Sequence, residues 1–103
     1  MLIVHSRNGI PVRLTEERWQ HICQRHPDMA SQRERVIETL AEPEVIQEGD
    51  FGTPLAVRMY LHTPLTRKFL VVVYREVTSE DGFVVTAYFA SQLSVRRTAL
   101  WTR

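Results

Sequence analysis

Hydrophobic and polar positions alternate over the first residues of the chain, which is the pattern of short strands. Residues 2–14, LIVHSRNGIPVRL, predict a hairpin that turns at Asn8 and Gly9, because this pair is the strongest two-residue turn signal. Pro11 lacks the amide hydrogen that a neighbouring strand would use. We therefore expect the second arm of the hairpin to lie at the edge of a sheet.

From residue 15 the apolar positions recur every three or four residues, which predicts two helices. The first begins after Thr15, a good N-cap, and ends near Arg25, because a proline two residues later disfavours helical geometry. The second begins with Ser31 and Glu34, a capping-box pair, and ends before the next proline.

Strand patterns return after the second helix. A short strand is expected in EVIQ, and longer strands are expected in residues 55–62, 68–75 and 83–90. The segment KFLVVVYR is apolar on both faces and should be the central strand, whereas the tail, 91–103, fits either a helix or a last edge strand. This order predicts an α+β fold in a single domain over residues 1–103. In this fold, two N-terminal helices pack on one face of a four-stranded antiparallel sheet. A short N-terminal hairpin precedes them.

The last two strands each divide into two alternating sets of side chains. One set is partly polar and contains Lys68, Tyr74, Thr86 and Tyr88. The other set is purely apolar and contains Phe69, Val73, Val85 and Phe89. We expect the helices to cover the apolar set.

Composition limits the class of protein. Of the 103 residues, 44% are hydrophobic and 24% are charged, which is ordinary for a globular domain. One cysteine excludes an internal disulfide, and no apolar run suits a signal peptide or membrane span. We therefore expect a cytoplasmic protein that needs no membrane. The net charge is +1, with acidic residues prevailing in 13–50 and basic residues in 51–103. An electropositive sheet or a simple dispersal of charge explains this equally well.

The run RWQHICQRHPDM, residues 18–29, carries two histidines that invite a metal. His21 and His26 are five residues apart, about 140° around a helix, whereas the zinc-binding HExxH spacing places its pair four apart on one face. We therefore predict no metal site here. No Gly-rich phosphate loop is present, and we expect no cofactor.

The same helical wheel brings three basic residues together. Arg18, His21 and Arg25 fall within about 60° of one another, and so line one edge of the first helix. This edge predicts an anionic partner, either a phosphate or carboxylates of the second helix. His26 is expected to end the helix, with its ring packed and bonded to a backbone carbonyl. Cys23 lies on the apolar stripe and is predicted to be a buried structural thiol rather than a nucleophile.

A second group of candidates comes from the predicted sheet. Lys68, Thr86 and Tyr88 lie there with Arg58 and Tyr60, and together they give a polar and aromatic surface. Aromatic rings beside cations suit single-stranded RNA, because rings stack on bases and cations pair with phosphates. The tail adds two more cations, Arg96 and Arg97, as substrate-binding candidates.

The sequence resembles a known family in four segments: LTEERWQHICQRHPDM, VIETLAEPEVI, RKFLVVVYRE and FVVTAYFAS. These are similar to the phage-type members of the barnase–EndoU–colicin–RelE superfamily of small metal-independent nucleases. That family is typified by R-x-x-H-I-x-x-R-H-P-E on a helix, T-L-x-x-P-D at a helix end, a lysine opening an apolar strand, and T-A-Y on a strand. Asp28 and Glu44 depart mildly, standing where Glu and Asp are usual.

The resemblance implies RNA cleavage and a set of site residues. It carries over His21, Lys68, Thr86 and Tyr88 as catalytic candidates, with Arg18, Arg25 and His26 in support. RNA supplies its own nucleophile, the 2′-hydroxyl, so the reaction needs a base, an acid and cations but no metal. We therefore expect a metal-independent endoribonuclease, toxin-like or phage-derived, that leaves a 2′,3′-cyclic phosphate.

Two alternatives remain. One is a non-catalytic module of the same fold that binds RNA or a protein partner, which the weak net charge favours. The other is a component active only on a ribosome or when fused to a carrier. RNA is the expected partner, a protein inhibitor or antitoxin is a second, and the chain is expected as a monomer or a homodimer paired through an edge strand.

Overall fold

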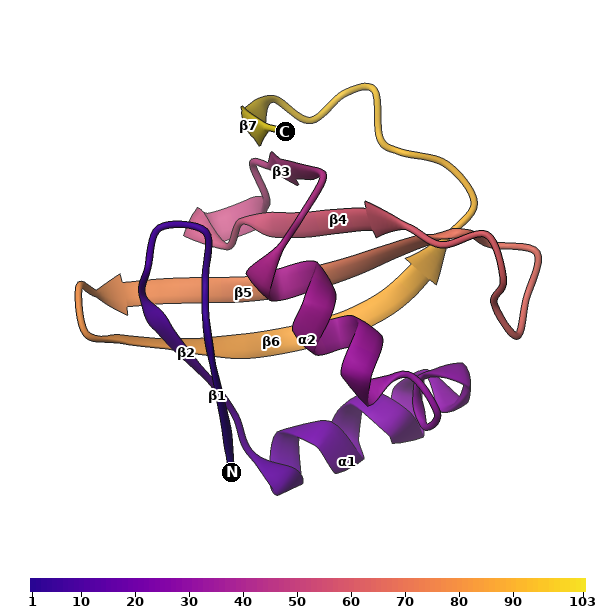
Figure 1. Ribbon diagram of the computed structural model, residues 1–103, viewed down its shortest axis with the longest axis horizontal. Coiled ribbons are helices and arrows are strands. Elements are labelled where there is room, and N and C mark those ends of the chain that lie inside the picture. Colours follow the sequence, from indigo (N-terminus) through magenta and orange to yellow (C-terminus); the bar gives the residue numbers. More distant parts are fainter.

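In the computed structural model, residues 1–103 form seven strands, two α-helices and two short 3-10 helices (Figure 1). The elements in chain order are β1 (Leu2–His5), β2 (Pro11–Leu14), α1 (Glu16–Arg25), η1 (Pro27–Met29), α2 (Arg33–Ala41), β3 (Val45–Gln47), η2 (Asp50–Gly52), β4 (Leu55–Met59), β5 (Phe69–Thr78), β6 (Asp81–Ala90) and β7 (Ala99–Thr102).

All seven strands belong to one mixed sheet with the order β1-β2-β6-β5-β4-β3-β7. β2 and β6 are parallel, and every other pair is antiparallel. The expected four-stranded antiparallel sheet is therefore wrong, although the α+β class and the central place of β5 are confirmed. The N-terminal hairpin joins the main sheet on one side, and the tail adds β7 on the other.

The N-terminal hairpin also differs from expectation in which arm is the edge. β1 is the edge strand, and β2 lies between β1 and β6. Pro11 is tolerated inside the sheet because it is the first residue of β2, where it faces only His5 of the partner strand. The parallel contact with β6 begins one residue later, at Val12 and Gly82.

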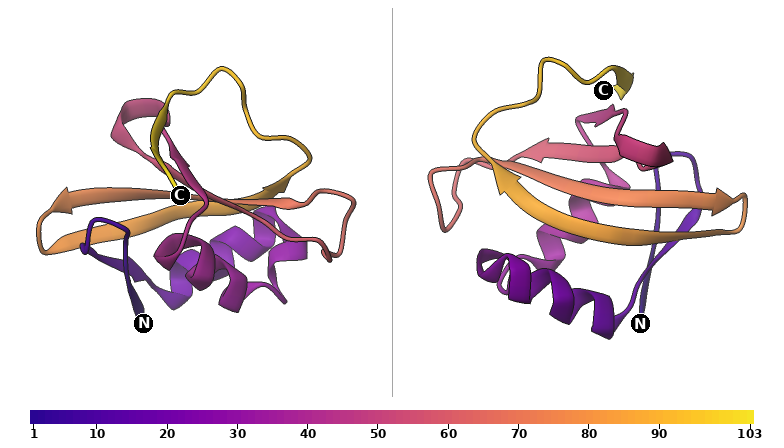
Figure 2. Two further views of the ribbon diagram at one scale, coloured as in Figure 1. Left: turned by 45° about the horizontal axis from the view of Figure 1, so that its top comes forward. Right: turned by 180° about the vertical axis from the view of Figure 1, so that it is seen from behind.

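Both helices cover the same face of the sheet, as Figure 2 shows, so this part of the prediction is confirmed. α1 packs against β6, and α2 packs against β1, β4 and β5. Trp19 and Ile22 of α1, together with Val36 and Leu40 of α2, are buried in the main hydrophobic core. Neither helix has the length and apolar character needed to cross a membrane.

The ends of α1 follow the sequence closely, whereas the start of α2 does not. Thr15 caps α1 by accepting a hydrogen bond from the backbone N–H of Arg18 at 3.1 Å, and the helix ends at Arg25 as predicted. α2 has Gln32 as its N-cap and no side-chain cap. The expected capping box is wrong because the Ser31 hydroxyl instead accepts a hydrogen bond from the Gln32 side chain at 3.0 Å.

A β-bulge in β6 changes which side chains face the helices. Val73 pairs with Thr86 and Tyr74 with Val84, so Val85 has no partner on β5. The extra residue reverses the alternation along β6 at this point. The consequence is that the two predicted alternating sets are each divided between the two faces.

The helix-facing side chains of these strands are therefore not the predicted set. Leu70, Val72 and Tyr74 of β5 lie in the core beneath the helices, with Val84, Ala87 and Phe89 of β6. On the opposite face, which we call the outer face, Leu55, Val57 and Val71 form a smaller apolar cluster. Phe69, Val73 and Tyr88 pack against that cluster. In Figure 2, left, the segment 91–98 arches above the outer face.

Candidate functional site

A pocket of about 490 Å³ lies between α1 and β6. We call it the α1–β6 pocket. It is lined by Arg18, His21, Ile22, Arg25, His26, Val85, Thr86 and Tyr88. The cationic edge predicted on the first helix thus meets the predicted Thr86 and Tyr88 pair across one cavity.

The sheet topology explains why a helix lies beside this strand. The pairing of β2 with β6 stops at Arg13 and Phe83, so the following residues of β6 have no strand on that side. The chain leaves the sheet after β2 and enters α1 directly. α1 consequently runs along the part of β6 that β2 leaves uncovered, with its buried Ile22 in the wall of the pocket.

The bulge in β6 decides which strand residues reach the pocket. Because Val85 is the extra residue, Thr86 and Tyr88 turn toward the outer face while Ala87 and Phe89 stay in the core. Bulges of this kind are common beside functional sites, where they redirect a side chain. Sequence reasoning missed Val85 and Ile22 as pocket walls, and no local sequence signal marks the bulge.

Two arginines of the pocket have no partner in the protein. The guanidinium groups of Arg18 and Arg25 form no ion pair and no hydrogen bond with the protein. The hydrogen bonds of these two residues involve only their backbone atoms. Of the two alternatives, pairing of these arginines with carboxylates of the second helix is therefore not observed. The ion pair between the helices runs in the other direction, from Arg33 of α2 to Glu16 of α1 at 2.9 Å.

The two histidines approach the pocket from different backbone settings. His21 is on α1 with a side chain that is 59% exposed, and its Nε2 lies 4.0 Å from Oε1 of Glu17. His26 follows the last residue of the helix, so the helical wheel does not apply to it. Both rings therefore line one cavity despite the five-residue spacing.

His26 is held by its backbone and by ring packing. Its backbone N–H donates to Ile22 at 2.8 Å, and its carbonyl accepts from Met29 at 2.9 Å. Its ring lies against Tyr88, with centroids 5.8 Å apart. The ring makes no hydrogen bond with the protein, so the expected bond to a backbone carbonyl is absent. Its nitrogens and the Tyr88 hydroxyl are free to bind a ligand.

Lys68 does not line the pocket. It precedes β5, its side chain is exposed, and its carbonyl accepts a hydrogen bond from the Tyr60 backbone at 2.7 Å. The structure thus brings together His21, Thr86 and Tyr88 from the four catalytic candidates. Among the lining residues, the positive charge comes from Arg18 and Arg25 instead.

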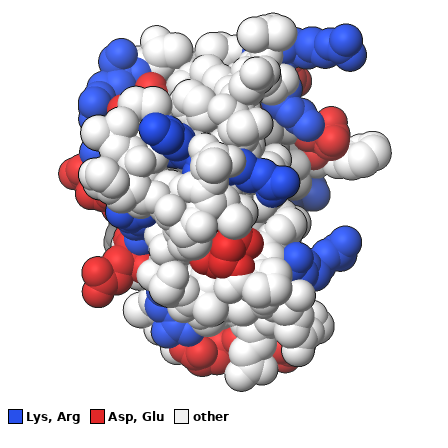
Figure 3. All heavy atoms as spheres, turned by 90° about the vertical axis from the view of Figure 1, so that its right-hand side faces the viewer, with Lys and Arg blue, Asp and Glu red and all other residues white.

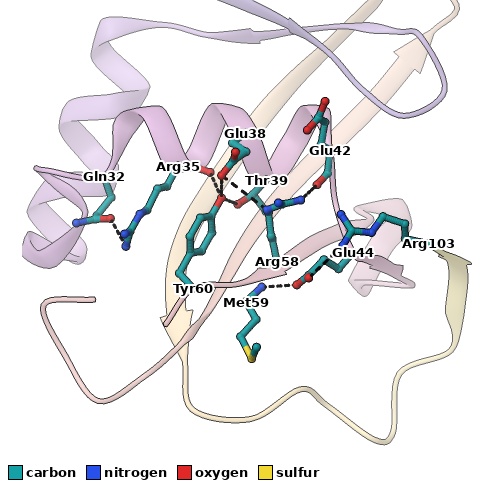
Figure 4. Close-up of polar contacts among 10 residues, drawn as sticks. All are labelled: Gln32, Arg35, Glu38, Thr39, Glu42, Glu44, Arg58, Met59, Tyr60 and Arg103. Carbon is teal, nitrogen blue, oxygen red and sulfur yellow. Dashed lines mark hydrogen bonds and ion pairs between the residues drawn. The ribbon is translucent and has the colours of Figure 1, made fainter. Parts of the chain in front are cut away.

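Arg58 and Tyr60 belong to a polar network on α2, seen in Figure 4. Arg58 donates to the carbonyl of Glu42 at 2.7 Å and pairs with Glu38 at 3.6 Å. The Tyr60 hydroxyl donates to Glu38 at 2.7 Å, so the Thr39 hydroxyl, 3.2 Å away, must donate to it. These bonds tie the end of β4 to α2 and place both residues outside the α1–β6 pocket.

This network also changes the acidity of Tyr60. Burial raises its pKa to about 12, and the Glu38 carboxylate adds to the effect. The ring is further covered by the guanidinium of Arg35, which lies 4.7 Å from its centroid. Burial and the Glu38 carboxylate thus favour the neutral phenol, and the packing of Arg35 on the ring marks Tyr60 as a structural residue.

The tail arginines lie beside a second hollow on the outer face. Arg97 is tied to η2, because it donates to the carbonyl of Glu48 at 3.2 Å and pairs with Asp50 at 3.5 Å. The side chain of Arg96 is exposed and makes no bond within the protein. Tyr88 lines this hollow as well as the α1–β6 pocket.

Charges and the single thiol narrow what the site can do. Figure 3 shows basic and acidic side chains interspersed on one side of the molecule, so attraction for an anion there depends on local unpaired cations. Cys23 packs against the core but is only partly buried, whereas the sequence predicts a buried thiol. Burial raises the pKa of its thiol, and the charge of Arg33 opposes this effect. No group of three or more His, Cys, Asp or Glu side chains is placed to hold a metal.

Comparison of the chain with known protein families, with curated proteins and with solved structures finds no match.

Proposed function

We propose that the protein is a metal-independent endoribonuclease whose active site is the α1–β6 pocket. One observation carries the proposal: Arg18, His21 and Arg25 of α1, with His26 directly after it, share a cavity with Thr86 and Tyr88 of β6. The resemblance to the phage-type barnase–EndoU–colicin–RelE-like nucleases supports the same reaction on His21, Thr86 and Tyr88, although not the role it gives to Lys68.

The reaction needs groups that this pocket contains. The 2′-oxygen of RNA forms a bond to phosphorus, and the bond from phosphorus to the 5′-oxygen breaks. A base takes the 2′-proton, and an acid gives a proton to the leaving 5′-oxygen. Histidine titrates near neutral pH and suits either role, so His21 and His26 supply the base and the acid. The products are a 2′,3′-cyclic phosphate and a free 5′-hydroxyl.

The remaining side chains bind the phosphate and a base. Negative charge grows on the phosphoryl oxygens in the transition state, and preorganised cations stabilise it. Arg18 and Arg25 have guanidinium groups free for this task, and the Thr86 hydroxyl donates to a phosphoryl oxygen. The Tyr88 ring, already beside His26, stacks on a nucleobase.

The proposal is tested by incubating RNA with the protein in EDTA and following fragments on a denaturing gel. We expect cleavage by the wild type, and about 10²- to 10⁴-fold slower cleavage by His21→Ala and by His26→Ala. Arg75→Ala is the control, because Arg75 is exposed on β5 and lines no pocket. Equal rates for the histidine variants and the control would refute the assignment.

A second candidate is an RNA-binding module that does not cleave. It is favoured by the exposure of His21, because a ring that is 59% exposed is less firmly positioned for proton transfer. In that case the unpaired arginines bind phosphate and the histidines add only weak contacts. Binding of RNA in the absence of any cleavage, with or without ribosomes, identifies this case.

A further inference from the structure

The second hollow is a groove of about 410 Å³ on the outer face, under the segment 91–98. We call it the outer groove. Its apolar walls are Leu55, Val57, Val71, Ala90, Leu93 and Val95, with Tyr88 at one end. Its polar members are Gln47, Gln92, Ser94, Arg96 and Arg97.

The strand register shows the direction of the groove. Tyr88 pairs with Val71, and Val71 pairs with Val57, so these side chains form a row across β6, β5 and β4. Gln47 of β3 continues the groove at the far side, next to Leu55. Neighbouring strands are about 4.8 Å apart, so the groove spans roughly 14 Å from β6 to β3. It therefore begins at Tyr88, where the α1–β6 pocket ends.

One polar side chain inside the groove has an unused acceptor. Gln47 is only 4% exposed, and its Nε2 donates to the carbonyl of Ser94 at 2.8 Å. A carbonyl oxygen only accepts, so this bond fixes which end of the amide is nitrogen. The Oε1 atom accepts no hydrogen bond from the protein. Since no fully buried side-chain oxygen or nitrogen lacks a partner, this oxygen keeps some contact with solvent.

The rim of the groove carries polar groups that are equally free. The side chains of Gln92 and Arg96 are exposed and form no ion pair or hydrogen bond within the protein. Arg97 differs, because its bonds to Glu48 and Asp50 hold the segment 91–98 over the sheet. The segment is thus anchored at Ser94 and at Arg97, and the free cation of Arg96 lies between these two anchors.

We propose that the outer groove binds an unpaired nucleobase of single-stranded RNA, on the nucleotide next to the one whose phosphate occupies the α1–β6 pocket. This inference rests on the proposed function. The base lies on the apolar floor at the β3 end, where a base N–H donates to Oε1 of Gln47, and the rest of the nucleotide extends along the groove toward Tyr88. Arg96 pairs with the phosphate of that nucleotide.

The groove fits a nucleotide better than a protein segment. Its volume is in the range of small-ligand sites, and it combines an apolar floor, one aromatic wall, one fixed acceptor and a free cation. A protein helix would need a longer apolar trough, and the polar rim of Gln92 and Arg96 would gain little from it. Continuity with the candidate phosphate site at Tyr88 favours RNA as the occupant.

The test uses a tetranucleotide of 2′-O-methyl RNA, which binds like RNA but has no free 2′-hydroxyl to attack phosphorus. Its affinity is measured at low salt by fluorescence anisotropy. We expect Arg96→Glu to weaken binding about tenfold and Gln47→Leu to weaken it by a similar factor. The control Arg75→Glu makes the same charge change four residues along β5 from Val71, about 13 Å away, and should change affinity less than about twofold.

A second measurement covers the case in which Gln47→Leu does not fold. In amide-correlation NMR spectra of the wild type, the side-chain signals of Gln47 and Gln92 should shift when the tetranucleotide is added. Unmoved signals, or equal losses of affinity in Arg96→Glu and Arg75→Glu, overturn the proposal. Either result would instead favour a protein partner as the occupant of the outer groove.

The experiments distinguish an error in the proposed base-binding groove from an error in the proposed nuclease activity. The binding experiment involves no cleavage, so the absence of nuclease activity does not affect it. Conversely, His21→Ala should abolish most cleavage while leaving the shifts of Gln47 and Gln92 in place. If the wild type cleaves RNA but the glutamine signals do not move, the proposed active site stands and the proposed base-binding groove is wrong.

Discussion

The imidazole ring of His26 lies against the phenol ring of Tyr88, with centroids 5.8 Å apart and planes inclined by 35°. His26 is the residue after α1, and Tyr88 is near the end of β6. The contact therefore joins the two elements that build the α1–β6 pocket. Tyr88 also forms one end of the outer groove, so this ring separates the proposed phosphate site from the proposed base site.

Replacing Tyr88 should affect RNA binding according to whether the ring is kept. Tyr88→Ala removes a stacking surface, which we expect to weaken binding of the 2′-O-methyl tetranucleotide by about 1–3 kcal/mol. Tyr88→Phe keeps the ring and should bind within about twofold of the wild type, since stacking does not need the hydroxyl. Fluorescence anisotropy measures both, and a Phe variant as weak as the Ala variant speaks against stacking.

The unpaired arginines of the pocket should matter for activity and not for stability. Arg25→Ala loses no bond within the protein, so its free energy of unfolding should stay within about 0.5 kcal/mol of the wild type. Its kcat/KM for RNA should fall by about 10²- to 10³-fold, the usual effect of losing one transition-state donor. Urea denaturation and initial cleavage rates provide the two numbers.

Arg33→Ala is the matched comparison for Arg25→Ala. Arg33 pairs with Glu16 and lies over the Trp19 ring at 5.2 Å, so its guanidinium is already engaged. This variant should lose about 0.5–1 kcal/mol of stability and keep most of its cleavage activity. The reverse outcome, with Arg33 needed for cleavage and Arg25 dispensable, would place the phosphate elsewhere.

Tyr60 should make the protein less stable in alkali. Its pKa rises from an ordinary 10.0 to about 12 on folding, because of burial and the Glu38 carboxylate. Between these pH values the unfolded chain releases the proton before the folded protein does, so the free energy of unfolding decreases as pH rises. Below pH 10 both states hold the proton and this effect is absent.

Tyr60→Phe isolates this effect. The variant should be less stable than the wild type at neutral pH, because it loses the hydrogen bonds to Glu38 and Thr39. Its stability should decrease less from pH 10 to 12, so the difference between the two proteins narrows over that range. Urea denaturation at a series of pH values measures the difference, and a constant difference contradicts the assigned pKa.

Gly82 should be essential for the close approach of β6 to β5. A Cβ atom at this position would lie 2.5 Å from the backbone oxygen of Arg75 and 3.4 Å from a Val12 methyl group. Gly82→Ala must therefore move β5 or β6, and we expect a loss of about 1–3 kcal/mol in the free energy of unfolding. Ser79→Ala, in the exposed turn between the same strands, should be nearly neutral.

Local features of the fold could be predicted from the sequence because they depend on neighbouring residues. Thr15 and the proline after His26 fix the ends of α1, and Asn8 with Gly9 fixes the hairpin turn. Hydrophobic period places β5 at the centre, because only that strand is apolar on both faces. These signals act within a few residues, where sequence and geometry are directly linked.

Long-range pairing and the bulge could not be predicted. The parallel contact of Val12 with Gly82 joins segments seventy residues apart and leaves no local pattern. The extra residue, Val85, looks like any strand valine, yet it reverses the faces of β6. For this reason the sequence places Tyr74 with Tyr88, whereas the structure buries Tyr74 beneath the helices.

The candidate site was predictable where it lies on one element. The spacing of Arg18, His21 and Arg25 on α1 places them on one edge, and all three line the pocket. Lys68 was assigned to the same site from family resemblance, and it lies outside the lining. Gln47 of the outer groove had no signal, because a buried glutamine in a three-residue strand resembles any other short strand residue.

The central claim is that the 2′-hydroxyl of RNA is the nucleophile in the α1–β6 pocket. The most direct measurement uses an oligonucleotide with one ribonucleotide in an otherwise 2′-deoxy chain, incubated with the protein in EDTA and analysed by mass spectrometry. The account predicts a single cut, after the ribonucleotide, with a 2′,3′-cyclic phosphate on the upstream fragment and no cut in the all-deoxy strand. Cutting of the all-deoxy strand, or an upstream fragment ending in a 3′-hydroxyl, would contradict it.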